Sequence, residues 1–221
     1  MRSAILGFAF CVSAALFPAT GQAMVYTFDF DEFTGGDVIT SITRGGLSAT
    51  VSGTGGIGEV VAFDTNNPTG GDSDLAADIE DLSGTVKAFG LIPIIQENGT
   101  VNNGTVNDPD DAAGGGTFTF VFDQMIRFLG TDFIDIEEPG ASIFLDGTQI
   151  LGPVGASGDG KFASVGGDPQ NRLGTTLSIT LVGSGSFDNL SVATVPLPMA
   201  GWLLISGVGG LFLMGRRRRA V

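Results

Sequence analysis

Short runs in which apolar and polar residues alternate recur along the chain between residues 24 and 194. Alternation with a period of two is typical of a β-strand that buries one face, since successive side chains point to opposite sides. Clusters of Gly, Asn and Asp separate nearly every run and favour tight turns. No window of eleven or more residues in this region has the spacing of an amphipathic helix. The predicted strands are residues 26–30, 47–51, 58–63, 118–122, 132–136, 142–145, 177–182 and 186–192.

Three segments give more local predictions. The pair Asp146-Gly147 separates two apolar-rich runs, which indicates a β-hairpin with a tight turn. Residues 91–95 are a continuous apolar run that favours a buried central strand, but Pro93 cannot donate a hydrogen bond and favours an edge or a bulge. The five residues 98–102 are repeated at once as 103–107, and two copies predict a loop or hairpin extension rather than a solenoid.

The fold class that follows from this pattern is all-β. Eight to eleven short strands joined by frequent turns are typical of a β-sandwich, and we expect a jelly-roll-like one. The sequence has 17 phenylalanines, mostly within the predicted strands, and these would supply much of the core.

The N-terminus has the three parts of a secretory signal peptide. Arg2 provides the positive charge, residues 4–17 are apolar, and small residues precede a cleavage position after Ala23. Cleavage there makes residues 1–23 the signal peptide and residues 24–194 the exported domain. An uncleaved N-terminal helix is disfavoured, because the apolar run is short for a bilayer.

The C-terminal residues 195–221 have a different composition from the domain. The motif at their start consists of Val195, Pro196, Leu197 and Pro198. It is stiff, because each proline fixes its own backbone and restricts the residue before it. Residues 197–215 carry no charged side chain and are long enough to form a transmembrane helix. A block of positive charge follows, consisting of Arg216, Arg217, Arg218 and Arg219. The positive-inside rule places this block in the cytoplasm and the rest of the chain across the membrane.

A proline-rich motif, a short apolar helix and a terminal arginine cluster, in this order, resemble the PEP-CTERM class of bacterial sorting signals, specifically its VPLPA-type variant. Met199 stands where that variant usually has alanine. The resemblance implies export across the inner membrane, a transient single-pass anchor with its tail in the cytoplasm, and cleavage by an exosortase-type membrane protease. The processed protein would then reach the cell surface or the extracellular space, and a link with exopolysaccharide and biofilm is implied. A plain C-terminal membrane anchor is the alternative interpretation.

Charge and missing residue types narrow the function. All 24 acidic residues lie between Asp29 and Asp188, and five of the ten basic residues belong to the two ends, so the exported domain has a net charge of −19. A nucleic-acid partner is excluded, because binding phosphates needs a basic face. The domain contains no His and, since Cys11 lies in the signal peptide, no Cys, which removes imidazole and thiolate catalysis. Paired carboxylates remain, but the domain has one Tyr and no Trp on which to stack a sugar, and we expect no enzyme activity.

Calcium is the ligand that this composition favours, because it takes six to eight oxygen ligands from carboxylates, carbonyls and water. In many jelly-roll sandwiches a calcium ion lies where the first and last strands meet, and this analogy selects Asp31, Glu32 and Asp188. A second group of candidate ligands comes from an acid-rich loop and from a later acidic segment: Asp64, Asp72, Asp74, Asp110 and Asp111. A hydrated acidic loop without a specific ion is the alternative.

These observations lead to two hypotheses. The first is a non-enzymatic exported cell-envelope or extracellular-matrix protein that calcium stabilises. The second is a calcium-dependent carbohydrate-binding module or a weak glycan-active enzyme in the same compartment. Residues 63–120 resemble a β-sandwich domain that recurs in secreted bacterial proteins and has no established activity, so this likeness bears on fold rather than on function.

Overall fold

The computed structural model describes residues 23–76, 78–138 and 140–195, which belong to one compact unit, Ala23–Val195. The described residues form thirteen strands and one 3₁₀ turn, with no α-helix, so the expected all-β class is confirmed. The elements are β1 (Val25–Phe28), β2 (Ser41–Arg44), β3 (Leu47–Thr54), β4 (Val60–Asp64), η1 (Ser73–Leu75), β5 (Ile79–Asp81), β6 (Val86–Lys87), β7 (Leu91–Ile95), β8 (Gly116–Ile134), β9 (Ala141–Leu145), β10 (Thr148–Val154), β11 (Lys161–Gly166), β12 (Gly174–Leu181) and β13 (Ser186–Thr194).

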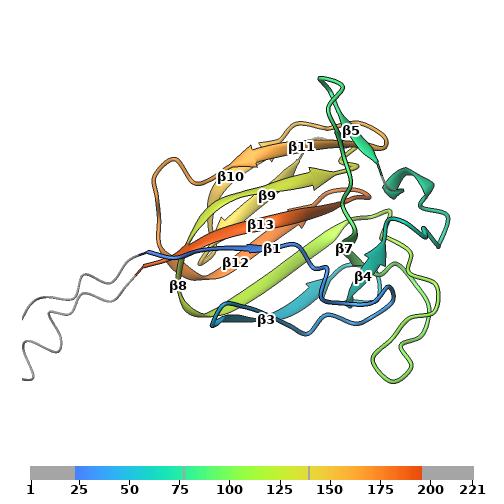
Figure 1. Ribbon diagram of the computed structural model, residues 1–221, viewed down its shortest axis with the longest axis horizontal. Helices are drawn as coiled ribbons and strands as arrows, with labels where there is room; N and C mark the ends of the chain where they lie inside the picture. The colour runs from blue at the N-terminus through green and yellow to red at the C-terminus, as the bar shows by residue number, and fades with distance from the viewer. Residues whose placement is uncertain (1–22, 77, 139, 196–221) are drawn as a thin grey trace, which may run out of the picture. The chain divides into compact units, whose positions relative to one another are not determined.

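One long bent strand, β8, organises the larger of two sheets (Figure 1). Its first half pairs with β12 and β3, and its second half pairs with β13 and β11. Phe118, Phe120 and Phe122 alternate with more exposed residues in the first half, so one face of the strand is buried. The predicted strands 118–122 and 132–136 therefore belong largely to one strand, because its pairing resumes at Ile126, after the exposed residues 123–125, and continues to Ile134.

The larger sheet has eleven strands and is mixed. Its main path runs β10-β9-β12-β8-β11-β5-β6, while β3 with β2 and β13 with β1 join β8 from the side. All of these pairs are antiparallel except β11 with β5, which are parallel. The halves of β8 thus belong to two different groups of strands.

The core lies between these two groups. The fully buried Phe187 on β13 packs edge-on against Phe118 at 4.9 Å and against Phe120 at 6.0 Å between ring centroids. Phe187 comes from the strand paired with the second half of β8, and the other two rings come from the first half. The buried faces of the two groups therefore face each other, and the expectation of a phenylalanine-rich core is confirmed.

A small second sheet consists of β4 and β7 only. Ala62 pairs with Pro93 in this ladder, and four of the five β7 residues are buried. The edge position predicted from Pro93 is confirmed, since β7 has one paired neighbour, but the strand is not central. Phe63, Ile92 and Ile94 join a second apolar cluster beneath this sheet.

The predicted hairpin at residues 146–147 is present between β9 and β10. Asp146 and Gly147 have φ values of 47° and 75°, and a two-residue turn that needs two positive φ angles favours this pair of residue types. The repeat at residues 98–107 forms a loop, as predicted, and its Thr105 makes isolated bridges to Asn102 and to Asp37.

Several strands were not predicted: β2, β5, β6 and β11. Three of them, β2, β5 and β6, have four residues or fewer, and each of the four strands buries few apolar side chains; β2, for example, buries only Ile42 fully. Their strand conformation comes from pairing with longer neighbours, which a local pattern does not reveal.

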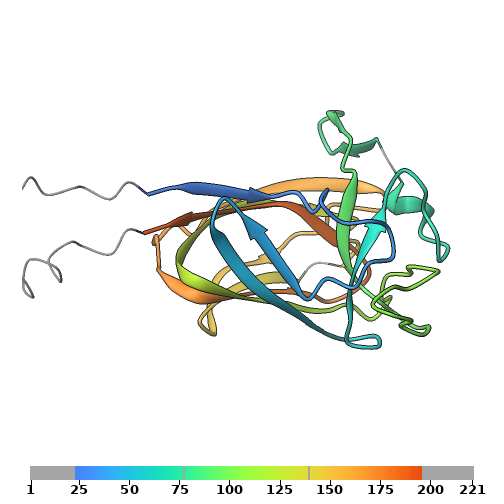
Figure 2. The same cartoon turned by 60° about the horizontal axis from the view of Figure 1, so that its bottom comes forward.

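The chain enters and leaves the domain at the same end, because β1 and β13 are antiparallel neighbours with Val25 opposite Ala193 (Figures 1 and 2). No helix among the described residues is long and apolar enough to cross a membrane. The predicted signal peptide up to residue 22, the motif residues Pro196, Leu197 and Pro198, the helix 197–215 and the block Arg216–Arg219 lie outside the described residues.

Candidate cation-binding site at the acidic end

The acid-rich loops lie at the end of the domain opposite the two chain ends (Figures 1 and 2). We call this the acidic end and define it by five aspartates that come from four separate segments: Asp72, Asp74, Asp111, Asp135 and Asp159. Both ends of β8 reach it, because the strand bends back at the other end of the domain. Residues far apart in the sequence thereby come close in space.

Three of these carboxylates form a triad: Asp74, Asp135 and Asp159 each offer an oxygen, and these oxygens all lie within 4.8 Å of one another. Asp135 follows the end of β8 and is completely buried, whereas Asp159 is exposed. The Gly160 amide donates a hydrogen bond of 2.7 Å to Asp135 Oδ1. Asp135 also has a φ of 56°, a left-handed backbone that Asp tolerates better than most residues.

Burial raises the pKa of Asp135 to about 7, and the negative charges of Asp74 and Glu137 also raise it. The hydrogen bond from Gly160 acts in the opposite direction and lowers this pKa. A positive charge beside a carboxylate in this environment stabilises its ionised form. The triad is therefore an arrangement that a hard cation would stabilise.

Asp72 and Asp111 form a second carboxylate pair at this end. The Asp111 amide donates to Asp72 Oδ2 at 2.9 Å, and Asp111 Oδ2 accepts hydrogen bonds from Ser184 Oγ (2.7 Å) and the Gly185 amide (2.6 Å). Ser184 Oγ also lies 3.4 Å from Asp135 Oδ2 and so connects the pair to the triad. Burial raises the pKa of Asp72 to about 7, and the charge of Asp111 contributes to the increase.

Asp188 lies on the last strand and is only 4% exposed. Among the described residues its Oδ1 atom has no hydrogen-bond partner. Burial raises the pKa of Asp188 to about 7; the nearby charge of Asp31 raises it further, and that of Lys87 opposes it. The charge of Asp31, which follows the first strand, therefore acts on Asp188 in the last strand.

The surroundings of Asp188 already contain a cation. Asn189 Nδ2 donates to Asp188 Oδ2 at 3.0 Å and to Asp132 Oδ2 at 2.9 Å. Asp132 in turn forms an ion pair with Lys87. A metal ion at Asp188 would compete with this ammonium group, so the triad is the better candidate site.

The structure separates the other predicted ligands from the triad. Glu32 lies 3.5 Å from Arg44 Nη2, which also pairs with Asp29, and Glu32 therefore sits in an ion pair. Asp110 accepts a hydrogen bond of 2.8 Å from Asn98 Nδ2; burial and the charge of Glu97 raise its pKa.

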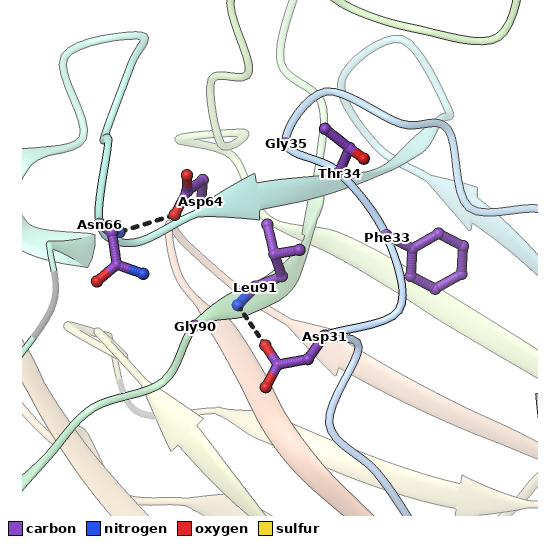
Figure 3. A pocket seen from close by; sticks show the side chains of 8 residues that line it. All are labelled: Asp31, Phe33, Thr34, Gly35, Asp64, Asn66, Gly90 and Leu91. Carbon is purple, nitrogen blue, oxygen red and sulfur yellow. Dashed lines mark hydrogen bonds between the residues drawn. The ribbon is translucent and has the colours of Figure 1, made fainter.

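Asp64 belongs to the turn after β4. Burial alone would raise its pKa, but hydrogen bonds from Asn67 and Asn66 hold it below the usual value. Asp64 also faces a pocket of about 350 Å³, shown in Figure 3. Asp31 lines the same pocket and accepts a hydrogen bond of 3.0 Å from the Leu91 amide. The full lining is Asp31, Phe33, Thr34, Gly35, Asp64, Asn66, Gly90 and Leu91.

Two triad residues were not among the predicted ligands. Asp135 belongs to an alternating run with apolar neighbours, where a buried acid is unusual, and this was the signal that could have identified it. Asp159 stands between two glycines, a pattern common to many solvated turns, so its sequence carries no distinctive signal.

No family model, curated protein or solved structure matches this chain. A proposal for function therefore rests on the residues of the two chain ends and on the geometry of the acidic end.

Proposed function

We propose that this chain is a non-enzymatic, exported cell-envelope or extracellular-matrix protein whose acidic end binds calcium. The residues of its C-terminus support transient anchoring in the inner membrane and cleavage near residues 195–198 by an exosortase-type protease. The described domain supports a jelly-roll-like β-sandwich, since two groups of strands enclose a phenylalanine-rich core. The processed protein would act at the cell surface or in the matrix, with exopolysaccharide as its expected surroundings.

The observation that carries the calcium proposal is the triad. Two oxygens on opposite sides of a calcium ion lie about 4.6–5.2 Å apart, because each Ca–O distance is about 2.3–2.6 Å. Asp74, Asp135 and Asp159 place their oxygens within 4.8 Å, so one ion can contact all three with little movement. Backbone carbonyls and water would complete the six to eight ligands, and the surface position of Asp159 leaves room for water.

Titration calorimetry on the metal-free domain tests this site. Calcium binding to the native domain is expected to give a heat signal that fits one strong site. The Asp135→Asn substitution is expected to abolish this signal. Asp78→Asn is the matched control, because Asp78 is an exposed acid of the same region outside the triad. Calcium binding that is equally tight in the Asp135→Asn protein would refute the assignment to the triad.

Mass spectrometry of the protein from its native cells tests the sorting proposal. A processed chain that ends within residues 195–198 is expected. Mature protein that always retains Arg216–Arg219 would contradict cleavage and would favour a permanent anchor.

The pocket in Figure 3 favours carbohydrate binding as a second candidate function. Asp31, Asp64 and Asn66 give it the hydrogen-bonding groups that bind sugar hydroxyls. The Phe33 ring points away from these carboxylates, so an aromatic stacking surface is missing from the inner wall. Polysaccharide pull-down, with calcium and with chelator, would detect such binding when the native domain is compared with the Asp64→Ala variant. Equal recovery of both proteins would exclude this pocket as the carbohydrate-binding site.

A further inference from the structure

The end of the domain at which both chain ends emerge carries exposed apolar side chains. We call it the terminal end and define it by five residues that are 38% to 64% exposed: Met24, Val25, Met125, Leu173 and Val195. Most large apolar residues of the domain lie in the core, so a group of five at one end is a distinct surface.

Hydrogen bonds hold these residues together although they come from separate parts of the chain. The Thr194 amide donates to the Met24 carbonyl at 2.9 Å, and the Val195 amide donates to the Met125 carbonyl at 3.3 Å. Leu173 immediately precedes the residue that pairs with Ile126. The start of β1, the bend of β8, the end of β13 and the loop before β12 therefore share this surface (Figures 1 and 2).

Basic side chains flank the apolar surface. Arg127 pairs in register with Ala193 and donates a hydrogen bond of 3.1 Å to Asn171, so both Arg127 and the loop 168–173 lie beside it. Arg172 in the same loop is bound to Asp168, which neutralises one of the two charges. The domain has five basic residues in all, and Lys87 and Lys161 contact carboxylates elsewhere. Exposed Asp123 lies two residues before Met125, and Asp146 accepts hydrogen bonds from the Thr175 and Thr176 amides, so the terminal end carries charges of both signs, unlike the acidic end.

We infer that the terminal end rests on the surface of the bilayer while the precursor is anchored, with its apolar side chains among the lipid headgroups. This inference rests on the proposed membrane anchor. Only Pro196 separates Val195 from the uncharged stretch 197–215, and one or two extended residues span less than about 8 Å. The domain is tethered within reach of the bilayer by this end, and Met, Leu and Val side chains enter the interface favourably.

The charge distribution fits the same orientation. Anionic lipids repel carboxylates and attract arginine, and both effects decay within about one Debye length. An upright domain keeps the five aspartates of the acidic end away from the lipid and brings Arg127 near the headgroups. It also holds the motif that starts at Val195 at the membrane surface, where a membrane-embedded protease acts.

Site-specific fluorescence on the full chain tests this orientation. The only native cysteine is Cys11, so Cys11→Ser allows single cysteines to be introduced by Met125→Cys, Leu173→Cys or Leu82→Cys. Leu82 is 77% exposed in the hairpin between β5 and β6 and serves as the control. In vesicles of phosphatidylethanolamine and phosphatidylglycerol, an environment-sensitive label at 125 or 173 should shift to shorter wavelength and be quenched by spin-labelled lipid. The label at 82 should do neither.

Three outcomes would overturn the inference. Labels at 125 and 173 that iodide in the aqueous phase quenches as strongly as the label at 82 would show that this end stays in water, although the chain is anchored. Labels shielded from iodide but not quenched by spin-labelled lipid would assign the surface to a second copy of the chain. A full chain that does not enter the vesicles at all would overturn the proposed anchor as well.

Discussion

Replacing Asp135 by Asn should stabilise the metal-free domain and remove its stabilisation by calcium. The substitution keeps an oxygen for the Gly160 amide and removes one buried negative charge. Burial raises the Asp135 pKa from 3.8 to about 7, and a shift of about three units corresponds to about 4 kcal/mol against the folded state at pH 8. Water near the exposed Asp159 screens the charge and reduces this to about 2 kcal/mol.

The sign follows from proton binding. The folded state holds the Asp135 proton up to about pH 7, and the unfolded chain loses it near 3.8. The folded state therefore binds more protons between these values, and the metal-free domain becomes less stable on this account as the pH rises from about 4 to 7. The Asp135→Asn protein lacks this cost. The additional stability of the metal-free variant over the native domain should be complete above pH 7 and should disappear toward pH 4.

Melting followed by circular dichroism measures both effects. For a domain of this size, 1 kcal/mol shifts the melting temperature by about 2–4 °C, so the metal-free Asn variant should melt about 4–8 °C above the native domain at pH 8. Calcium at roughly ten times its dissociation constant adds about 1.4 kcal/mol, or about 3–6 °C, to the native domain and nothing to the variant. The Asp78→Asn control should keep the full calcium response.

Either of two results would refute this reasoning. A variant that melts below the native domain in chelator at pH 8 would show that the Asp135 charge is not a cost to the fold. A variant that keeps the calcium-dependent increase would show that the ion binds elsewhere.

Three further predictions test the fold, each by chemical denaturation. Phe187→Ala should cost about 3–5 kcal/mol, because it empties a fully buried position between two rings, whereas Val121→Ala on the exposed face should cost less than about 0.5 kcal/mol. Thr131→Val should cost about 1 kcal/mol, since it removes the buried 2.7 Å hydrogen bond to the Asp188 carbonyl without changing the shape of the side chain. Gly147→Ala should cost about 1 kcal/mol, because its φ of 75° disfavours a Cβ atom.

The sequence predicted those features that depend on neighbouring residues. Alternation identified the strands that bury one face, and Asp146-Gly147 identified a hairpin because the turn itself requires this chemistry. Pro93 identified an edge strand, since it cannot donate to a second neighbour.

Features that depend on distant pairing were missed. The polar residues at the middle of β8 interrupt the apolar pattern, but β12, β3, β13 and β11 pair along most of its length and keep it one strand. The candidate site shows the same limit. The acid-rich loop suggested Asp74, but its partners Asp135 and Asp159 come from segments that only the tertiary structure brings to it.

The path of the chain explains why attachment and negative charge lie at opposite ends. Because β1 and β13 are antiparallel neighbours, the chain enters and leaves at one end, and the bend of β8 at that same end sends both of its ends to the other. A strand of nine residues such as β13 spans about 30 Å, which is more than three Debye lengths at physiological salt. Carboxylates at the acidic end therefore add little repulsion to a membrane contact at the terminal end. The domain can carry a net charge of −19 and still approach an anionic surface, provided that it approaches by the end from which its anchor leaves.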